Sequence, residues 1–182
     1  MTITTLAMLH QGDHAIVITP SYQSLEEGIK FAGSDLIRIA LSPDNGWALD
    51  LKAVEAAIRG NTKYIVLNDP HNPSGALMNE ESKNRLVALA EKHDILIFSD
   101  EVYRLLEFNP ADRSLSIAEM TSNGIALNTM AKPFGAGGMC IGWVVCQDAG
   151  IIEKLRKAQH LFGVCFSRAG EIQAMMAIRA KD

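Results

Sequence analysis

The chain has 182 residues, 48% of them hydrophobic, and its 17 basic and 21 acidic side chains give a net charge of −4 at pH 7. This composition predicts one globular domain with a sizeable core, and the lack of a basic run makes nucleic acid a poor candidate partner. The apolar runs are shorter than the roughly 18 residues that span a bilayer, and the first residues do not form a secretion signal. We therefore expect a cytoplasmic protein that does not bind membranes.

Cysteine and histidine are too scattered to indicate a disulfide framework or a metal site. The three cysteines, Cys140, Cys146 and Cys165, form neither a CxxC pair nor an even set. They are interpreted as reduced thiols. The five histidines fall in separate segments without the spacing of metal ligands, so no metal is predicted.

Helices and strands alternate along the first part of the chain. Apolar spacing and turn residues predict, in order, a helix over 2–10, a strand over 15–18, a helix over 21–32, a strand over 36–41, a helix capped by Asp50 and a strand over 64–68. The loop 69–75 follows, and its two prolines exclude a helix or a central strand.

The second part continues the alternation. Asn79 is predicted to cap a helix that runs to about residue 91, and 95–99 is the most strand-like run in the chain. An irregular stretch then precedes a strand that leads into Lys132. The remaining predicted elements are a strand over 141–146 and helices over 149–160 and 168–180.

This order predicts an α/β fold in which a predominantly parallel sheet is covered on both faces. Ligands of such sheets bind outside the carboxyl ends of the strands. Four segments directly follow predicted strands: 20–22, the loop around Asn72, 100–103 and 129–132. We expect them to gather at one edge of the sheet.

These segments contain a set of groups that suits one cofactor. Lys132 lies at a strand end between apolar neighbours, where desolvation would favour the neutral, nucleophilic amine that forms a Schiff base. Pyridoxal phosphate (PLP) needs such a lysine and a carboxylate beside its ring nitrogen, for which Asp100 is the candidate. Asn72 and Tyr103 are candidate donors to the phenolic oxygen, and Tyr22 is a candidate stacking ring. Taken singly, Asp100 could instead cap a turn, and Tyr22 could cover the core.

Three sequence blocks together resemble a known family. Asn-Asp-Pro-His-Asn-Pro-Ser-Gly at 68–75, Ser-Asp-Glu-Val-Tyr at 99–103 and Ala-Lys-Pro-Phe-Gly…Ile-Gly-Trp at 131–143 resemble, in order and spacing, the class I/II aminotransferases of the aspartate aminotransferase superfamily, fold type I. The resemblance covers essentially the whole chain. It implies a three-layer α-β-α large domain over residues 1–182, truncated at both ends, from a protein that is a homodimer at full length.

The resemblance also implies roles for individual residues. It makes Lys132 the Schiff-base lysine and proton shuttle, and Asp100 the partner of the pyridine nitrogen. Asn72 and Tyr103 then bind the ring oxygen of the cofactor. Tyr22 matches the stacking aromatic, and Thr129 matches a hydroxyl that touches the phosphate.

The sequence departs from the family pattern at two places near the lysine. Cys140 stands where an arginine usually binds the cofactor phosphate, and Ala131 stands where a serine is common. A neutral thiol cannot form a charge-assisted pair with phosphate, so weaker phosphate binding is expected. The resemblance also begins after the family's glycine-containing phosphate loop and ends before the C-terminal small domain.

The implied activity is amino-group transfer between an amino acid and a 2-oxo acid. The same residues would serve a carbon–sulfur lyase or another lyase of this fold, because absent segments set which substrate bond is broken. Two further alternatives are a non-catalytic effector domain of the kind found in transcription regulators and an inactive fragment.

Overall fold

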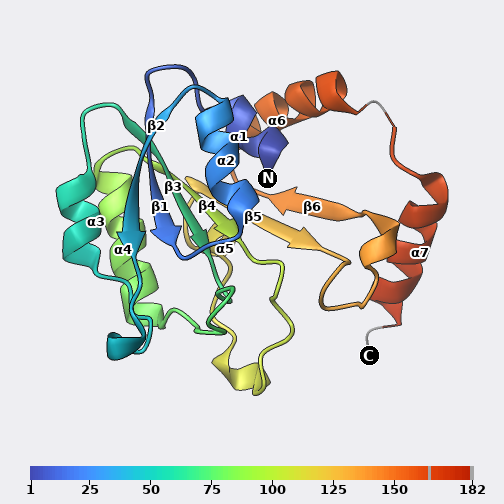
Figure 1. Ribbon diagram of the computed structural model, residues 1–182. Helices are drawn as coiled ribbons and strands as arrows, with labels where there is room; N and C mark the ends of the chain where they lie inside the picture. Colours follow the sequence, from blue (N-terminus) through green and yellow to red (C-terminus); the bar gives the residue numbers. More distant parts are fainter. Residues whose placement is uncertain (164, 181–182) are drawn as a thin grey trace.

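Six strands form one sheet in the computed structural model, which describes residues 1–163 and 165–180 (Figure 1). The strands are β1 (His14–Thr19), β2 (Asp35–Ala40), β3 (Thr62–Asn68), β4 (Leu96–Asp100), β5 (Gly124–Thr129) and β6 (Gly142–Val145). Their order across the sheet is β2-β1-β3-β4-β5-β6. β1 to β5 pair in parallel, and β6 is antiparallel to β5. The prediction of a predominantly parallel sheet is therefore confirmed.

Helices cover both faces of this sheet and give three layers. Residues of α1 (Thr2–Met8), α2 (Gln23–Phe31) and α6 (Ala149–Phe162) pack on one face. Residues of α3 (Leu51–Ala57), α4 (Glu80–Lys92) and α5 (Ile117–Met120) pack on the other. The short 3-10 helices are η1 (Pro43–Asn45), η2 (Pro110–Asp112) and η3 (Gly137–Met139).

The core follows the two-residue alternation of the strands. In β3, Ile65 and Leu67 pack with α3 and α4, whereas Tyr64 and Val66 face α1 and α2. Both sets are buried because a parallel sheet of this kind is covered on both sides. The strand interiors are consequently apolar runs rather than alternating polar and apolar residues.

The helices α3 and α4 begin at the N-cap residues that the sequence predicts. The Asp50 carboxylate accepts hydrogen bonds from the Lys52 and Ala53 amides at the start of α3, and the Asn79 side chain accepts one from Ser82 in α4. Both predicted caps are confirmed. Each satisfies backbone donors that the first turn of a helix leaves unpaired.

Two parts of the secondary structure differ from the prediction. The stretch after β4 contains α5, which begins with a capping box formed by Ser116 and Glu119. Its four residues are too short to show helical periodicity in the sequence. In addition, α2 begins two residues later than predicted, because Tyr22 is its extended N-cap residue.

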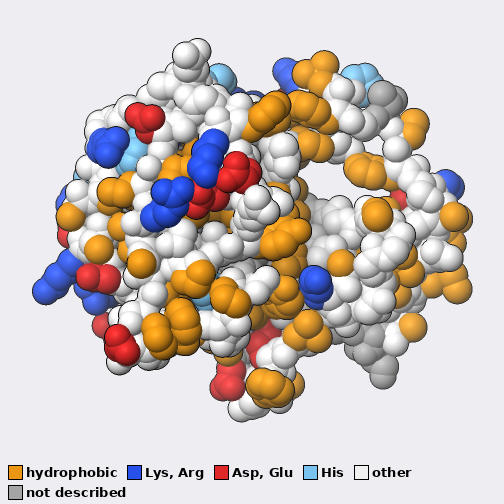
Figure 2. Space-filling model, in the orientation of Figure 1, with side chains coloured by type: hydrophobic (Ala, Val, Ile, Leu, Met, Phe, Trp, Pro, Cys, Tyr) orange, Lys and Arg blue, Asp and Glu red, His pale blue; other side chains and the backbone are white. Residues whose placement is uncertain are grey.

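The last helix, α7 (Arg168–Arg179), lies at the right edge of the molecule beyond β6 (Figure 1). It packs on η3, and Gly170 approaches the Met139 carbonyl and the Ile141 side chain. Hydrophobic side chains gather over the end of α6 and on α7 in Figure 2.

Within residues 1–163 and 165–180, no helix is both long and apolar enough to cross a membrane. The same described residues contain no group of three or more His, Cys, Asp or Glu side chains placed to hold a metal ion.

Candidate active site

The register of the central strands brings three polar strand ends side by side. Asn68 at the end of β3 lies opposite Asp100 at the end of β4, and Asp100 lies opposite Leu127 in β5. Thr129 is two residues further along β5, on the same face as Leu127. The carboxyl ends of parallel strands meet at one sheet edge, and a ligand site is expected there.

A cavity of about 410 Å³ opens at this edge. Its walls come from the residue before α1, the loop before α2, the ends of β3, β4 and β5 with the segments that follow them, and the start of β6. The lining residues are Met1, Tyr22, Asn68, Asn72, Asp100, Val102, Tyr103, Leu127, Asn128, Thr129, Lys132 and Gly142. All six residues predicted for the site, Tyr22, Asn72, Asp100, Tyr103, Thr129 and Lys132, are therefore brought together.

The amide and the phenol are hydrogen-bonded to each other. Asn72 Nδ2 donates to Tyr103 Oη at 3.2 Å. Lys132 Nζ lies 5.8 Å from the centroid of the Tyr103 ring, within the range of a cation–π contact. The two predicted ligands of a phenolic oxygen thus form one unit beside the lysine.

The loop that carries Asn72 is fixed by a buried histidine. His71 Nε2 lies 2.8 Å from the Pro20 carbonyl, and His71 Nδ1 lies 2.6 Å from Ser74 Oγ. The contact to Pro20 links this loop to the segment that carries Tyr22. The Tyr22 ring lines the cavity and is 53% exposed, so the alternative in which it covers the core is wrong.

Asp100 is a buried carboxylate with few donors. It is 3% exposed, and among the described residues it accepts one hydrogen bond, from the Val102 amide at 3.3 Å. Burial is the main reason that its pKa rises from 3.8 to about 6. A cationic N–H donor placed in the cavity would stabilise the ionised form, and the pyridinium nitrogen of PLP is such a donor. The lysine, the carboxylate and the amide–phenol pair of the cavity therefore fit this cofactor.

Lys132 reaches the cavity from the turn after β5. Thr129 shapes this turn, because its Oγ1 donates to the Ile141 carbonyl at 3.1 Å and accepts from the Ala131 amide at 3.1 Å. Lys132 itself is exposed. The prediction that the Lys132 side chain would be desolvated is wrong for this chain, because its apolar neighbours at 131, 133 and 134 do not cover it.

Cationic side chains are scarce around the cavity. Among the described residues that line it, Lys132 is the only cationic side chain. Cys140 is exposed at the end of η3, two residues before Gly142, and has a left-handed backbone with φ of 52°. Among the described residues that line the cavity, no arginine takes the place of the one that the family pattern puts at position 140.

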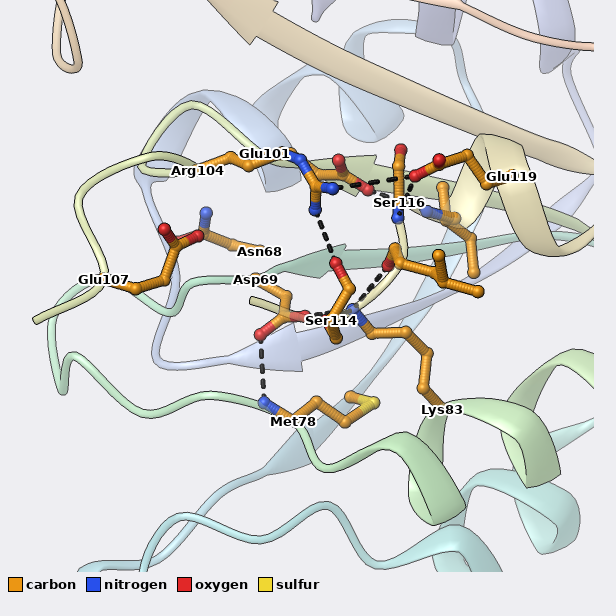
Figure 3. Close-up of polar contacts among 12 residues, drawn as sticks. Asn68, Asp69, Met78, Lys83, Glu101, Arg104, Glu107, Ser114, Ser116 and Glu119 are labelled. Atoms are coloured by element: carbon orange, nitrogen blue, oxygen red, sulfur yellow. Dashed lines mark hydrogen bonds and ion pairs between the residues drawn. The ribbon is translucent and has the colours of Figure 1, made fainter. Parts of the chain in front are cut away.

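A network of polar side chains joins the segments after β3 and β4 to α4 and α5 (Figure 3). Because side chains alternate along a strand, Glu101 points away from Asp100 and accepts a hydrogen bond from the Ile117 amide at 2.9 Å. Lys83 forms a buried ion pair with Asp69 at 2.5 Å and also donates to Ser114. These contacts hold the segments after β3 and β4 against α4 and α5.

Sequence reasoning did not single out Asn68. Its side chain accepts from the Asn72 amide at 2.6 Å and donates to the Asp100 carbonyl at 2.7 Å. The sequence signal that could have indicated Asn68 was an asparagine at the end of a predicted buried strand, four residues before Asn72. Asn128 and Met1 also line the cavity without having been predicted.

The chain belongs to a known family. The sequence profile of the family described as "Aminotransferase class I and II" matches residues 1–182. The α/β fold and the motifs around the cavity agree with this assignment, and the predicted resemblance to fold type I aminotransferases is confirmed.

Individual relatives agree with the family assignment. The chain is 30% identical over 180 residues to an aspartate aminotransferase from Sulfolobus acidocaldarius, covering 97% of this chain and 45% of the relative. It superposes with a TM-score of 0.92 on the N-succinyldiaminopimelate aminotransferase from Mycobacterium tuberculosis, at 28% identity, covering 100% of this chain and 48% of that one. It also superposes with a TM-score of 0.90 on a PLP-dependent aminotransferase from Streptococcus suis, at 31% identity, covering 98% and 47%. The chain thus spans about half the length of the relatives it matches.

Proposed function

We propose that residues 1–182 form the cofactor-binding large domain of a PLP-dependent aminotransferase, which transfers an amino group from an amino acid to a 2-oxo acid. The observation that carries the proposal is the convergence of a lysine, a buried carboxylate and a hydrogen-bonded amide–phenol pair at one cavity. The family match and the named aminotransferases among its relatives support the same activity. No observation favours the lyase or the non-catalytic alternatives.

Besides Lys132, five residues of the cavity are each assigned a role toward the cofactor. Asp100 accepts the N–H of the cofactor ring nitrogen and keeps that nitrogen protonated. Asn72 and Tyr103 donate to the ring oxygen, and Tyr22 offers a flat face for stacking. Thr129 contributes a hydroxyl near the phosphate.

Lys132 has two roles in the proposed reaction. Its Nζ would hold PLP through the cofactor's aldehyde group, and once free, the neutral amine would take the α-proton of the substrate and return it. When bound, PLP supplies the electron sink that makes this proton acidic. The Tyr103 ring lies beside this amine, with its centroid 5.8 Å from Lys132 Nζ.

We also propose a small-molecule substrate pair, a homodimer at full length and a cytoplasmic location. The relatives named above act, by their names, on different amino acids, so the substrate class is kept at amino acid and 2-oxo acid. The apolar side chains exposed on α7 support a further protein contact. The three cysteines are free thiols, which fits a reducing compartment.

The proposal is tested by the absorbance spectrum of the protein after incubation with PLP and removal of free cofactor. We expect a lysine-linked cofactor band in the wild type that is lost in Lys132→Ala and retained in Lys154→Ala, which removes an exposed lysine of α6. Adding an amino acid should shift the band and release the matching 2-oxo acid. A wild-type protein without any band would contradict the proposal.

A further inference from the structure

Asn68 lies between Asp100, which is assigned to the ring nitrogen of the cofactor, and Asn72, which is assigned to the ring oxygen. It is buried, with 6% exposure, and it lines the cavity at the end of β3. Its Oδ1 accepts from the Asn72 amide at 2.6 Å, and its Nδ2 donates to the Asp100 carbonyl at 2.7 Å. One side chain therefore joins the residue assigned to the ring nitrogen to a residue assigned to the ring oxygen.

The hydrogen bonds continue beyond Asn72. Asn72 Nδ2 donates to Tyr103 Oη, so a chain of contacts runs from the Asp100 backbone through Asn68 and Asn72 to Tyr103. Tyr103 follows Asp100 by three residues, and the contacts therefore close a ring between β3 and β4. Such a ring fixes the separation between the carboxylate and the amide–phenol pair.

The loop 69–75 has few other backbone donors that could tie it to the end of β3. Residues 70 and 73 are prolines and have no backbone N–H, which leaves few main-chain donors on either side of Asn72. The Asp69 amide bonds to the Asp100 carbonyl, and the His71 amide turns back to Ala76 within the loop. The Asn72 amide is thus the donor that ties the tip of the loop to the strand end, and Asn68 is its acceptor.

We propose that Asn68 is a positioning residue that sets the distance between Asp100 and the Asn72–Tyr103 pair. The role of Asn68 toward the cofactor rests on the proposed function. The hydrogen bonds from Asn68 to Asp100 and Asn72 do not depend on it. Asn68→Ala removes both bonds. Asn68→Asp keeps an acceptor for Asn72 and removes the donor to the Asp100 carbonyl.

The first measurement is hydrogen exchange of the Asn72 amide in the cofactor-free protein. In the wild type we expect this amide to be protected by at least about tenfold relative to an unstructured peptide, because its acceptor is buried. Asn68→Ala should remove that protection, and Asn68→Asp should retain it. Asn84→Ala and Asn84→Asp, at an exposed position of α4, are the matched controls and should match the wild type.

The second measurement is the pH midpoint of the cofactor's absorbance change. Asn68→Ala, which adds no charge, should shift it by roughly half a pH unit or more, because the donors to the ring oxygen are no longer held against Asp100. The Asn84 variants should leave it unchanged.

The outcomes separate this inference from the proposed function. An unprotected Asn72 amide in the wild type, a protected one in Asn68→Ala, or an unchanged midpoint in folded Asn68→Ala would overturn the positioning role. If the wild type shows no cofactor band, the proposed function fails, and exchange at Asn72 alone then decides whether Asn68 holds the loop. If Asn68→Ala does not fold, Asn68→Leu, which keeps a side chain of similar size and removes both bonds, provides the same two readouts.

Discussion

At the scale of single residues, two neighbouring carboxylates have opposite surroundings. Asp100 lines the cavity, whereas Glu101 faces α5 and accepts from the Ile117 amide. Burial raises the pKa of both groups. Among the described residues, one backbone amide donates to the Asp100 carboxylate, so this carboxylate can still accept a hydrogen bond from a ligand.

The raised pKa of Asp100 predicts a pH dependence of stability in the cofactor-free protein. A folded pKa of about 6, above the ordinary 3.8, means that the folded state holds the proton more tightly. The stabilisation is complete below the unfolded pKa and is lost as pH rises through about 6. This group should make the free energy of unfolding larger at pH 5 than at pH 8, by roughly 1 kcal/mol.

Urea unfolding at the two pH values measures this difference. Asp100→Asn should reduce it by that amount, and Asp44→Asn, at an exposed position of η1, should not. Equal pH dependence in the wild type and Asp100→Asn would contradict the assignment.

A second prediction concerns the neutral residue at position 140. Cys140→Arg places a guanidinium at the end of η3, where it can pair with a phosphate dianion. We expect the affinity for PLP to rise by about tenfold, the worth of one charge-assisted contact, and the affinity for pyridoxal, which lacks the phosphate, to stay the same. Cys165→Arg is the control. Titration followed by absorbance gives both affinities, and an equal gain for the two ligands would argue against a phosphate contact.

At the scale of elements, α4 is fastened to the strand ends by a buried ion pair. Lys83 and Asp69 are 4% and 6% exposed and lie 2.5 Å apart, and Lys83 also donates to Ser114 and to the Leu115 carbonyl. Asp69 in turn accepts from the Met78 amide at 3.0 Å. The network therefore joins α4, the loop before it and the segment that leads into α5 (Figure 3).

Removing one partner of this pair should be costly. Lys83→Met leaves the Asp69 carboxylate buried without its cation, so we expect a loss of roughly 3 kcal/mol or more in the free energy of unfolding. Lys92→Met, in the last turn of the same helix, breaks an exposed pair with Glu55 and should cost less than about 1 kcal/mol. Denaturant unfolding of the two variants provides the comparison. Adding Asp69→Asn to Lys83→Met should recover much of the loss; similar losses in the two single variants would refute this account.

At the scale of the whole molecule, the sheet and its two helical layers contrast with α7. The central strands are buried on both faces, while α7 exposes Ile172, Met175, Met176 and Ile178. It packs mainly on η3, at the edge of the structure (Figure 1). Little buried apolar surface therefore stabilises this helix.

This contrast predicts two levels of local stability. Backbone amides of α7 should exchange with solvent through local opening, at a free energy well below that of global unfolding, whereas amides of β1, β3 and β4 should exchange through global unfolding. Hydrogen exchange across a series of low denaturant concentrations distinguishes the two. Equal opening free energies for α7 and the central strands would show that α7 is part of the cooperative core.

The sequence by itself determined the order of the strands and longer helices, the two-sided burial of the strands, the helix caps at Asp50 and Asn79, and six of the residues that line the cavity. These features follow from periodicity, from turn residues and from the rule that parallel strands present their carboxyl ends together. Only the tertiary structure decided that Asn68 bridges Asp100 and Asn72, that Glu101 supports α5, and that Lys132 is exposed. Those facts depend on strand register and on contacts between segments some 30 residues apart, which no local pattern encodes.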